Sequence, residues 1–412
     1  MPHETELIGT VAVGLTAAFA FALVAVRLRL PPIVGYLLAG VAVGPFTPGF
    51  VADAHLAPQL AEIGVILLMF GVGVHFSPGD LLAVRGIALP GALGQIAAAT
   101  ALGVGVSSLW GWSLGEGLVF GLALSVASTV VLLRALEERS AVATPSGRVA
   151  VGWLLVEDLA MVVALVLLPT LAGPLGGTAP AAGEGGLLAT LALTLGKVAL
   201  FAALMFAVGW RIVPWLLHRV ARIGSRELFL LATLAAALGI AFAGAEFFGV
   251  SFALGAFVAG LVVGQSEVGH EAGEQVVPLQ DAFAVLFFVS VGMLIEPAFL
   301  LDAPGRILAV AAIVVVGKTA AAFLIVLLLR GGLDKAVVVG AALAQIGEFS
   351  FILASLGRSL DLLPPDGYNL ILAGALVSIT LNPLLFRLAD GAAARAGARQ
   401  GVTASASTRS GT

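Results

Sequence analysis

Four ionisable side chains lie deep within apolar stretches of this sequence, where a charge is energetically expensive. They are Glu157, Asp158, Lys318 and Glu348. A charged side chain in the hydrocarbon of a bilayer costs several kcal/mol unless it is paired or hydrated, so each is a candidate functional group. Carboxylates and an ammonium in such surroundings are suited to binding and releasing protons and cations.

Glu157 and Asp158 are adjacent in the segment VGWLLVEDLAMVVALVLLP. Neighbouring residues of a helix point about 100° apart, so one carboxylate can face a cavity while the other faces a partner helix. Two close carboxylates at low dielectric do not both stay ionised cheaply, and at least one is expected to exchange protons near neutral pH. Once deprotonated, the same oxygens suit a dehydrated alkali cation. The alternative is a buried ion pair that only holds helices together.

Lys318 lies in the middle of AVAAIVVVGKTAAAFLIVLLL. An unpaired buried ammonium is strongly penalised, so we expect it to pair with one of the two adjacent carboxylates. It would release that partner when a cation arrives, which makes protons and cations compete. A permanent salt bridge or a lysine that snorkels to the membrane surface is the alternative.

Two further apolar stretches contain polar interruptions, SVAST at Ser125–Thr129 and AQIGEFS at Ala344–Ser350. Small hydroxyl residues and glycine at mid-span predict local unwinding, which a membrane tolerates only where the backbone lines a cavity or is buried in protein. Opposed half-helices would bring their dipole ends to one point. The candidate residues there are Ser128, Thr129, Gln345 and Glu348. Serine and threonine that merely bond their own helix are the alternative.

The composition defines the class of the whole chain. Of 412 residues, 60% are hydrophobic and only 11% charged, whereas soluble domains have about 25% charged residues. The apolar runs are continuous and not alternating, so we predict an all-α polytopic membrane protein and exclude a membrane β-barrel. The absence of cysteine and of an HExxH spacing argues against a thiolate or zinc site. We therefore expect no cofactor, no nucleic-acid partner and no enzyme activity.

Thirteen spans are predicted from the length of these runs. They are 6–28, 31–50, 58–76, 84–108, 116–137, 148–171, 187–217, 226–247, 249–265, 279–296, 306–330, 334–357 and 366–389. We expect the chain to lie in an inner membrane. Lysine and arginine fall almost entirely at alternate loops, which places the N-terminus outside and the C-terminus in the cytoplasm. We see no removable signal peptide, because the N-terminus is acidic and not basic.

An internal repeat is visible at an offset of about 220 residues. GYLLAGVAVG at Gly35–Gly44 matches GAFVAGLVVG at Gly255–Gly264. Three further pairs follow in the same order: GVGVHFSP with SVGMLIEP, which pairs Gly73 with Gly292, ALGQIAAA around Gln95 with VVGKTAAA around Lys318, and GLALS at Gly121 with GAALA at Gly340. Seven helices separate each pair, so the two six-helix halves are inverted, a common architecture of secondary transporters. We predict a first repeat at 1–186, a connecting helix at 187–225, a second repeat at 226–390 and a disordered cytoplasmic tail at 391–412.

An ordered set of motifs over residues 8–390 resembles the Kef-type branch of the monovalent cation/proton antiporter-2 family. The motifs are LPPIVGYLLAGVAVGP, LMFGVGVHFSP, LALSVASTVVLLRALEER, GWLLVEDL, FFVSVGM and QIGEFSF. The resemblance implies a sodium/proton antiporter-like fold with crossed broken helices, a homodimer, and elevator-like alternating access of a mobile core. It also implies that Asp158 is the ion-binding aspartate, Glu157 the variable residue before it, and Lys318 the lysine that can pair with that residue.

The chain departs from this family pattern at two places. Kef potassium systems usually have Gln-Asp, and electrogenic sodium/proton relatives Asp-Asp, where this chain has Glu157-Asp158. Electroneutral and electrogenic exchange therefore both stay open. The second departure is at the C-terminus, where Kef-type proteins often continue into a cytosolic nucleotide-binding regulatory domain, whereas about 20 small and polar residues follow the last span here.

The predicted function is secondary antiport, in which Asp158 binds either H⁺ or an alkali cation, K⁺ or Na⁺. A cation channel and a sodium-coupled solute symporter on a similar scaffold are the rival hypotheses. A channel would need a continuous polar path, and a symporter more polar residues near the crossover. An intramembrane aspartyl protease would need two deep aspartates on different helices, and only Asp158 is clearly deep.

Overall fold

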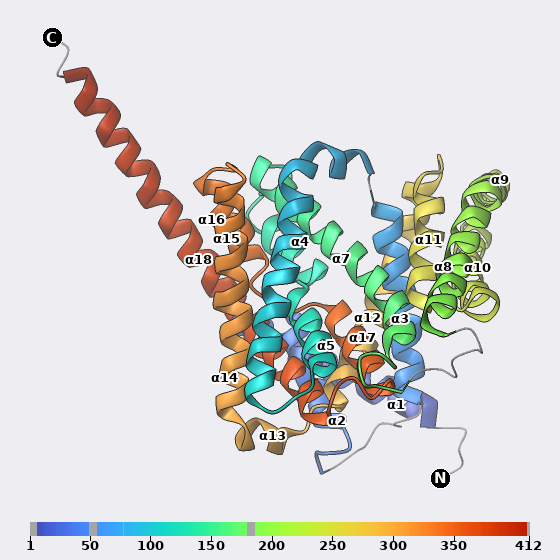
Figure 1. Ribbon diagram of the computed structural model, residues 1–412. Coiled ribbons are helices and arrows are strands. Elements are labelled where there is room, and N and C mark those ends of the chain that lie inside the picture. The colour runs from blue at the N-terminus through green and yellow to red at the C-terminus, as the bar shows by residue number, and fades with distance from the viewer. Residues whose placement is uncertain (1–5, 49–55, 77, 179–185, 410–412) are drawn as a thin grey trace. The chain divides into compact units, whose positions relative to one another are not determined.

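Helices make up every regular element in the part of the chain that the computed structural model describes, residues 6–48, 56–76, 78–178 and 186–409 (Figure 1). The elements are α1 Glu6–Arg27, α2 Pro32–Val43, α3 Leu56–His75, α4 Pro78–Leu109, α5 Leu114–Ser125, α6 Thr129–Glu137, α7 Pro145–Leu171, α8 Gly186–Leu204, the π-helix η2 Met205–Gly209, α9 Trp210–Ala221, α10 Arg226–Phe248, α11 Phe252–Gly264, α12 Gly269–Met293, α13 Pro297–Asp302, α14 Pro304–Ala312, the π-helix η3 Ile313–Lys318, α15 Thr319–Leu328, α16 Leu333–Ala342, α17 Glu348–Ser359 and α18 Pro365–Arg409. Each of the thirteen predicted ranges contains a helix, and α13 is an additional short one.

The chain is a multi-pass membrane protein. Within the described ranges, nine helical stretches are long and apolar enough to cross a bilayer, and three shorter apolar helices accompany them. About 20 apolar residues are needed to cross the hydrocarbon core as a helix. The total of thirteen spans and the orientation of the termini remain predictions.

Both predicted helix interruptions are present. α5 ends at Ser125 and α6 begins at Thr129, with extended backbone at Val126 and Ser128. The second break separates α16, which ends at Ala342, from α17, which begins at Glu348. The polar and glycine-containing motifs that predicted the breaks thus coincide with them.

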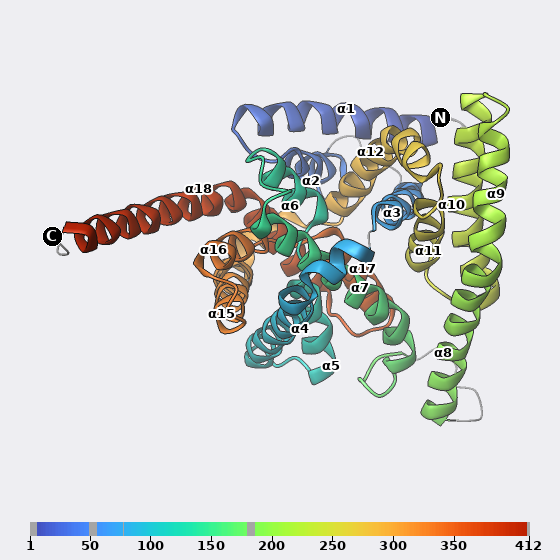
Figure 2. The ribbon, with the colours of Figure 1, turned by 90° about the horizontal axis from the view of Figure 1, so that it is seen from above.

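Two compact units divide the chain, and each takes helices from both predicted repeats. Unit 1 comprises residues 1–78, 162–302 and 359–362, and unit 2 comprises residues 79–161, 303–358 and 363–412. In unit 1, α1 lies along α2 and α2 packs against α12 (Figure 2). In unit 2, α16 packs against α15 and α18.

Glycine contacts hold the helices of unit 1 at close range. A Cβ added to Gly40 on α2 would overlap backbone of α12 beside Gly292, and a Cβ on Gly292 would overlap backbone of α2 beside Gly40. Gly73 on α3 and Gly260 on α11 block each other's Cβ positions with backbone in the same way. Small residues are what allow membrane helices to approach this closely.

These two contacts correspond to each other under the predicted repeat. The repeat offset of about 220 residues relates Gly40 to Gly260 and Gly73 to Gly292. The contact of α2 with α12 is therefore the counterpart of the contact of α11 with α3. Such reciprocal pairing is expected of two halves related by a pseudo-two-fold axis, and the inverted repeat itself stays a prediction.

The C-terminal segment differs from its prediction. Residues 391–409, for which the small polar composition predicted disorder, continue α18 as a helix to Arg409. Alanine is frequent in this segment and has the highest helix propensity of all residues, so the helix of the preceding span extends into it. Residues 410–412 lie outside the described residues.

The glycine contact between α3 and α11 makes a prediction for stability. Gly260→Ala is expected to lower stability by about 1–3 kcal/mol, because the new methyl group overlaps the carbonyl of Phe70 and forces the helices apart. Gly239→Ala on α10 is the matched control, because a Cβ at this position would meet no atom within 4 Å. This variant should keep or raise stability. Thermal unfolding of both variants in detergent, followed by intrinsic fluorescence, checks this. Equal unfolding temperatures would contradict the assigned contact.

Candidate functional site

All seven residues that the sequence singled out lie in unit 2 and surround the two helix breaks. They are Ser128, Thr129, Glu157, Asp158, Lys318, Gln345 and Glu348. Six of the seven side chains are buried and that of Thr129 is half-buried. The elements that supply them are the start of α6, the middle of α7, the end of η3, and the break between α16 and α17. The structure therefore brings the whole predicted constellation together.

Side chains provide hydrogen-bond partners for the backbone groups that the first break leaves without helical bonds. Ala127 N donates to Glu157 Oε2 at 3.0 Å. Gln345 makes a two-point contact with Ser128, since its Oε1 accepts from Ser128 N at 2.9 Å and its Nε2 donates to Ser128 O at 3.1 Å. Buried backbone groups outside helices need such partners, and here Glu157 and Gln345 supply them.

The two breaks also bond directly to each other. Gly347 N donates to Val126 O at 3.1 Å, and a Cβ on Gly347 would overlap the backbone of Ala127. Only glycine fits here, which explains the glycine of the QIGEFS motif. Ile346 N donates to Ser378 Oγ of α18 at 3.3 Å, so the second break is fixed from two sides.

Donor side chains meet the carbonyl ends of the first half-helices. Gln95 Nε2 donates to Ser125 O at the end of α5 and Asn382 Nδ2 to Ala341 O at the end of α16, while Lys318 Nζ donates to Gln345 O in the second break, each at 3.0 Å. The C-terminal end of a helix carries partial negative charge and unpaired carbonyls, and these donors satisfy both.

Lys318 does not form the direct ion pair that the sequence predicted. In the described residues its Nζ has no salt bridge to Glu157 or Asp158, and it bonds the Gln345 carbonyl instead, while its charge acts on Glu157 from farther away. Lys318 ends the π-helical turn η3, and π-turns frequently occur at functional sites. The carbonyls freed by the broken helix compete for the ammonium, which the sequence pattern alone did not reveal.

Glu157 has both carboxylate oxygens occupied. Besides Ala127 N, its Oε1 accepts a hydrogen bond from Trp153 Nε1 at 3.1 Å, one turn earlier on α7. The side chain is fully buried. Its contacts fix the position of the first break and give each carboxylate oxygen one hydrogen-bond donor.

Asp158 differs from its neighbour in having an unpaired oxygen. Its Oδ2 accepts from Thr129 Oγ1 at 3.2 Å, whereas Oδ1 is buried and has no hydrogen-bond partner. Only 3% of the residue is exposed, and the charges of Glu348 and Glu157 act on it. A buried acceptor without a partner is costly, and a proton or a cation would satisfy it.

Glu348 is the first residue of α17 and also lies beside Ser128 and Thr129, which begin α6. Two helix N-termini, with their partial positive charge, therefore face its carboxylate. No hydrogen bond of ordinary geometry reaches either of its carboxylate oxygens. Ser128 itself caps α6, since its Oγ accepts from Val131 N at 3.3 Å.

Sequence reasoning missed four residues that support the site, Gln95, Trp153, Ser378 and Asn382. Gln95 entered only as a landmark of the repeat, and the others were not considered. The criterion that found the charged residues, a polar group deep in an apolar span, would also have found Gln95 and Asn382 if neutral amides had been included. Trp153 and Ser378 carry no comparable signal, because both are common in membrane helices.

Comparison with known proteins places this fold and site. Paired broken helices around buried carboxylates define a membrane protein of the antiporter type, and the family model for the sodium/hydrogen exchanger transmembrane region matches residues 14–387. The chain belongs to the sodium/hydrogen exchanger family. The resemblance to cation/proton antiporter-2 proteins of the Kef type is thereby confirmed.

Three similar proteins illustrate the relationship. A protein of Escherichia coli (strain K12) named putative cation/proton antiporter YbaL is 57% identical over 390 residues, covering 95% of this chain and 70% of that protein. The K(+) efflux antiporter 4 of Arabidopsis thaliana is 36% identical over 360 residues, covering 87% of this chain and 60% of that protein. The solved structure of the sodium proton antiporter MjNhaP1 from Methanocaldococcus jannaschii has a TM-score of 0.70 at 16% identity, covering 93% and 97% of the two chains.

The double contact of Gln345 with Ser128 makes a prediction about the first break. Gln345→Ala leaves the buried N–H of Ser128 unpaired, whereas the Ser128 carbonyl keeps its hydrogen bond from Leu132 N, so the change should cost about 1–3 kcal/mol. Amide hydrogen exchange of peptides covering 126–131 should therefore become faster. Gln265→Ala, on an exposed residue that caps the end of α11, is the matched control and should leave exchange there unchanged. Unaltered exchange in the Gln345 variant would contradict this role.

Proposed function

We propose that this chain is a secondary active antiporter that exchanges a monovalent cation, K⁺ or Na⁺, for H⁺. The observation that carries the proposal is the buried, unpaired Oδ1 of Asp158 in a cluster of excess negative charge. Glu157, Asp158 and Glu348 are three carboxylates against the single ammonium of Lys318. If all were ionised, two negative charges would be uncompensated at low dielectric, so the cluster needs a bound positive ion.

Asp158 is the group that carries this ion. Glu157 is held by two hydrogen bonds, and Glu348 faces two positive helix ends, so both carboxylates already stabilise the broken helices. Asp158 binds H⁺ as a carboxylic acid or an alkali cation as a carboxylate, with the Thr129 hydroxyl as a neighbouring oxygen. The two ions exclude each other because they occupy the same oxygen, and this competition couples their movements.

Alternating access follows from the division into two units. Unit 2 contains every residue of the site, so it can carry the ion as one body, and we assign it as the mobile core and unit 1 as the scaffold of an elevator-type cycle in a homodimer. Charge compensation permits the movement, since Lys318 balances Glu157, two positive helix N-termini face Glu348, and a bound H⁺ or cation balances Asp158. We place the protein in an inner membrane, with its C-terminus in the cytoplasm.

The transported cation is K⁺ or Na⁺ in this proposal. The names of the similar proteins support both, since one is a K(+) efflux antiporter and another a sodium proton antiporter. Carboxylate and hydroxyl oxygens suit hard cations in general and do not choose between these two.

Removal of the Thr129 hydroxyl tests the competition between proton and cation. Thr129→Val deletes the hydrogen bond to the ionised carboxylate of Asp158, so H⁺ competes more strongly and the half-saturating cation concentration should rise by about tenfold, which corresponds to about 1.4 kcal/mol. The increase should be larger at lower pH, where H⁺ is more abundant. Thr129→Ser keeps the hydroxyl and should behave like the parent protein. Equal half-saturation in both variants at each pH would contradict the role of the hydroxyl.

The central test is Asp158→Asn in proteoliposomes that hold a preset proton gradient. A pH-sensitive dye should report proton movement on addition of NaCl, KCl or LiCl to the parent protein, and none with the variant, because Asn binds neither H⁺ nor a cation as a charged carboxylate does. Asp302→Asn, on an exposed residue of α13, is the matched control and should retain exchange.

Four other outcomes would overturn the proposal. Exchange retained in Asp158→Asn would remove the assignment, and loss in Glu348→Gln but not in Asp158→Asn would transfer the role to Glu348. A uniport current under a clamped membrane potential, without proton coupling, would indicate a channel. Cation-driven uptake of an organic solute would indicate a symporter.

A further inference from the structure

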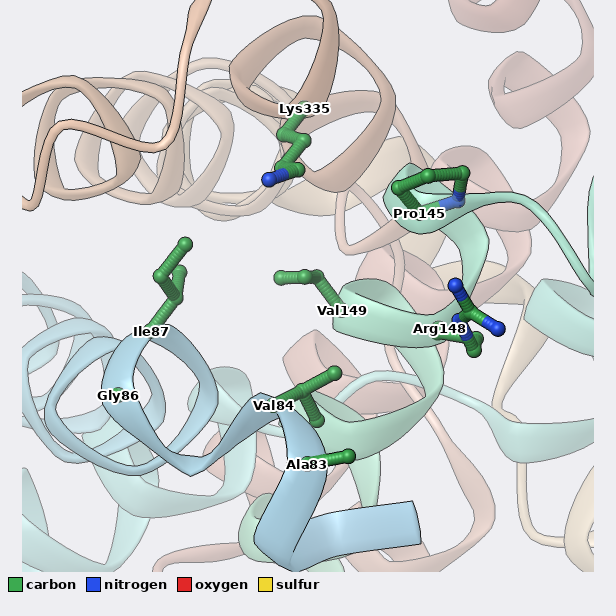
Figure 3. A pocket seen from close by; sticks show the side chains of 8 residues that line it. All are labelled: Ala83, Val84, Gly86, Ile87, Pro145, Arg148, Val149 and Lys335. Carbon is green, nitrogen blue, oxygen red and sulfur yellow. The ribbon is translucent and has the colours of Figure 1, made fainter.

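A second feature of unit 2, separate from the ion site, is a pocket between the N-terminal parts of α4, α7 and α16 (Figure 3). Its volume is about 470 Å³. No step of the proposed exchange uses this pocket. It combines two cationic side chains, Arg148 and Lys335, with an apolar wall that includes Val84, Ile87 and Val149.

Neither cation has an acidic partner among the residues that the structure describes. In the described part of the chain neither Arg148 nor Lys335 forms a salt bridge, and no acidic residue is among those that line the pocket. Asp334 precedes Lys335 but is exposed and does not line the pocket. Figure 3 shows the Lys335 ammonium extending from α16 toward the space beside Ile87 and Val149.

Helix ends add to the positive potential. α7 begins at Pro145 and α16 at Leu333, so each cation lies in the first turn of its helix, where the backbone dipole is also positive. No side chain caps the start of α16. At the start of α7, the Thr144 Oγ1 accepts from Gly147 N, so the N-terminus without a side-chain cap is that of α16. An anion is the ligand that satisfies this helix N-terminus together with the two cations.

We propose that this pocket binds a phosphate group, either that of an anionic phospholipid or a free phosphate ion. Arg148 and Lys335 would hold the phosphate oxygens, and the wall of Val84, Ile87 and Val149 would accept the adjoining hydrocarbon of a lipid. Both cations belong to the set that the sequence places at the cytoplasmic helix ends, which is the membrane surface where anionic headgroups attract basic residues.

Native mass spectrometry of the full chain in detergent tests the proposal with defined lipids. The parent protein should retain phosphatidylglycerol in preference to phosphatidylcholine. The double variant Arg148→Gln with Lys335→Gln should bind phosphatidylglycerol about thirtyfold more weakly, since each basic residue near a membrane surface contributes about 1 kcal/mol to the attraction of an anionic lipid. The pair Arg148→Lys with Lys335→Arg keeps both charges and should retain the lipid.

A matched control removes two cations elsewhere. Arg211→Gln with Arg222→Gln deletes two exposed charges at α9 and should leave retention of phosphatidylglycerol unchanged. Thermal unfolding in neutral detergent with inorganic phosphate is the second arm, and the chloride salt at equal ionic strength is its reference. Stabilisation of the parent by phosphate but not of the double Gln variant would identify free phosphate as a ligand, whereas lipid retention alone would identify the phospholipid.

Two results would overturn the proposal. Equal loss of lipid in the α9 control and in the pocket variant would show that only overall surface charge matters. Absence of any selective effect in both arms, with all variants folded as judged by size-exclusion chromatography, would show that the pocket binds no phosphate.

Discussion

The need to satisfy the backbone at two broken helices, inside a medium without water, determines most of unit 2. A helix break in a membrane exposes N–H and C=O groups that cost several kcal/mol each when unpaired, and it also exposes the partial charges of the helix ends. The protein meets both needs with a fixed set of polar side chains. Glu157 and Gln345 pair the first break, and Gln95, Lys318 and Asn382 supply donors to the carbonyl ends.

The hydrogen bonding of the backbone at the first break explains why the adjacent carboxylates of Glu157 and Asp158 have different roles. Glu157 and Asp158 point in different directions from α7, as neighbouring residues of a helix must. Glu157 points toward Ala127 N and the indole of Trp153 and accepts a hydrogen bond from each. Asp158 points toward Thr129 and accepts from its hydroxyl, which leaves Oδ1 of Asp158 without a partner. The difference arises from geometry alone, since the two groups have the same chemistry and similar burial.

Much of this arrangement could be predicted from the sequence, because membrane burial makes polar residues conspicuous. The positions of the helices, both breaks and the seven site residues followed from apolar length, from charge and from short polar motifs. Pairing was harder to predict. Lys318 was expected to meet a carboxylate, but it bonds the Gln345 carbonyl, because a broken helix creates strong acceptors that a residue pattern does not display. The helical tail to Arg409 was also missed, since a small polar composition suits both disorder and an alanine-rich helix.

The two predicted repeats solve the same backbone problem with different side chains, and the difference is informative. Gln95 and Lys318 each follow a glycine at matching repeat positions, and each donates to a backbone carbonyl at a helix break, Gln95 to the last residue of α5 and Lys318 to Gln345 within the second break, at the same distance of 3.0 Å. A neutral amide is therefore sufficient for this contact. The charge of Lys318 must answer another need, and the nearby Glu157, on which it acts electrostatically, provides one. Lys318 thus has two roles. It donates to a backbone carbonyl, as Gln95 does, and its charge compensates the carboxylate of Glu157. The negative charge of Asp158 is then left to be balanced by a bound ion.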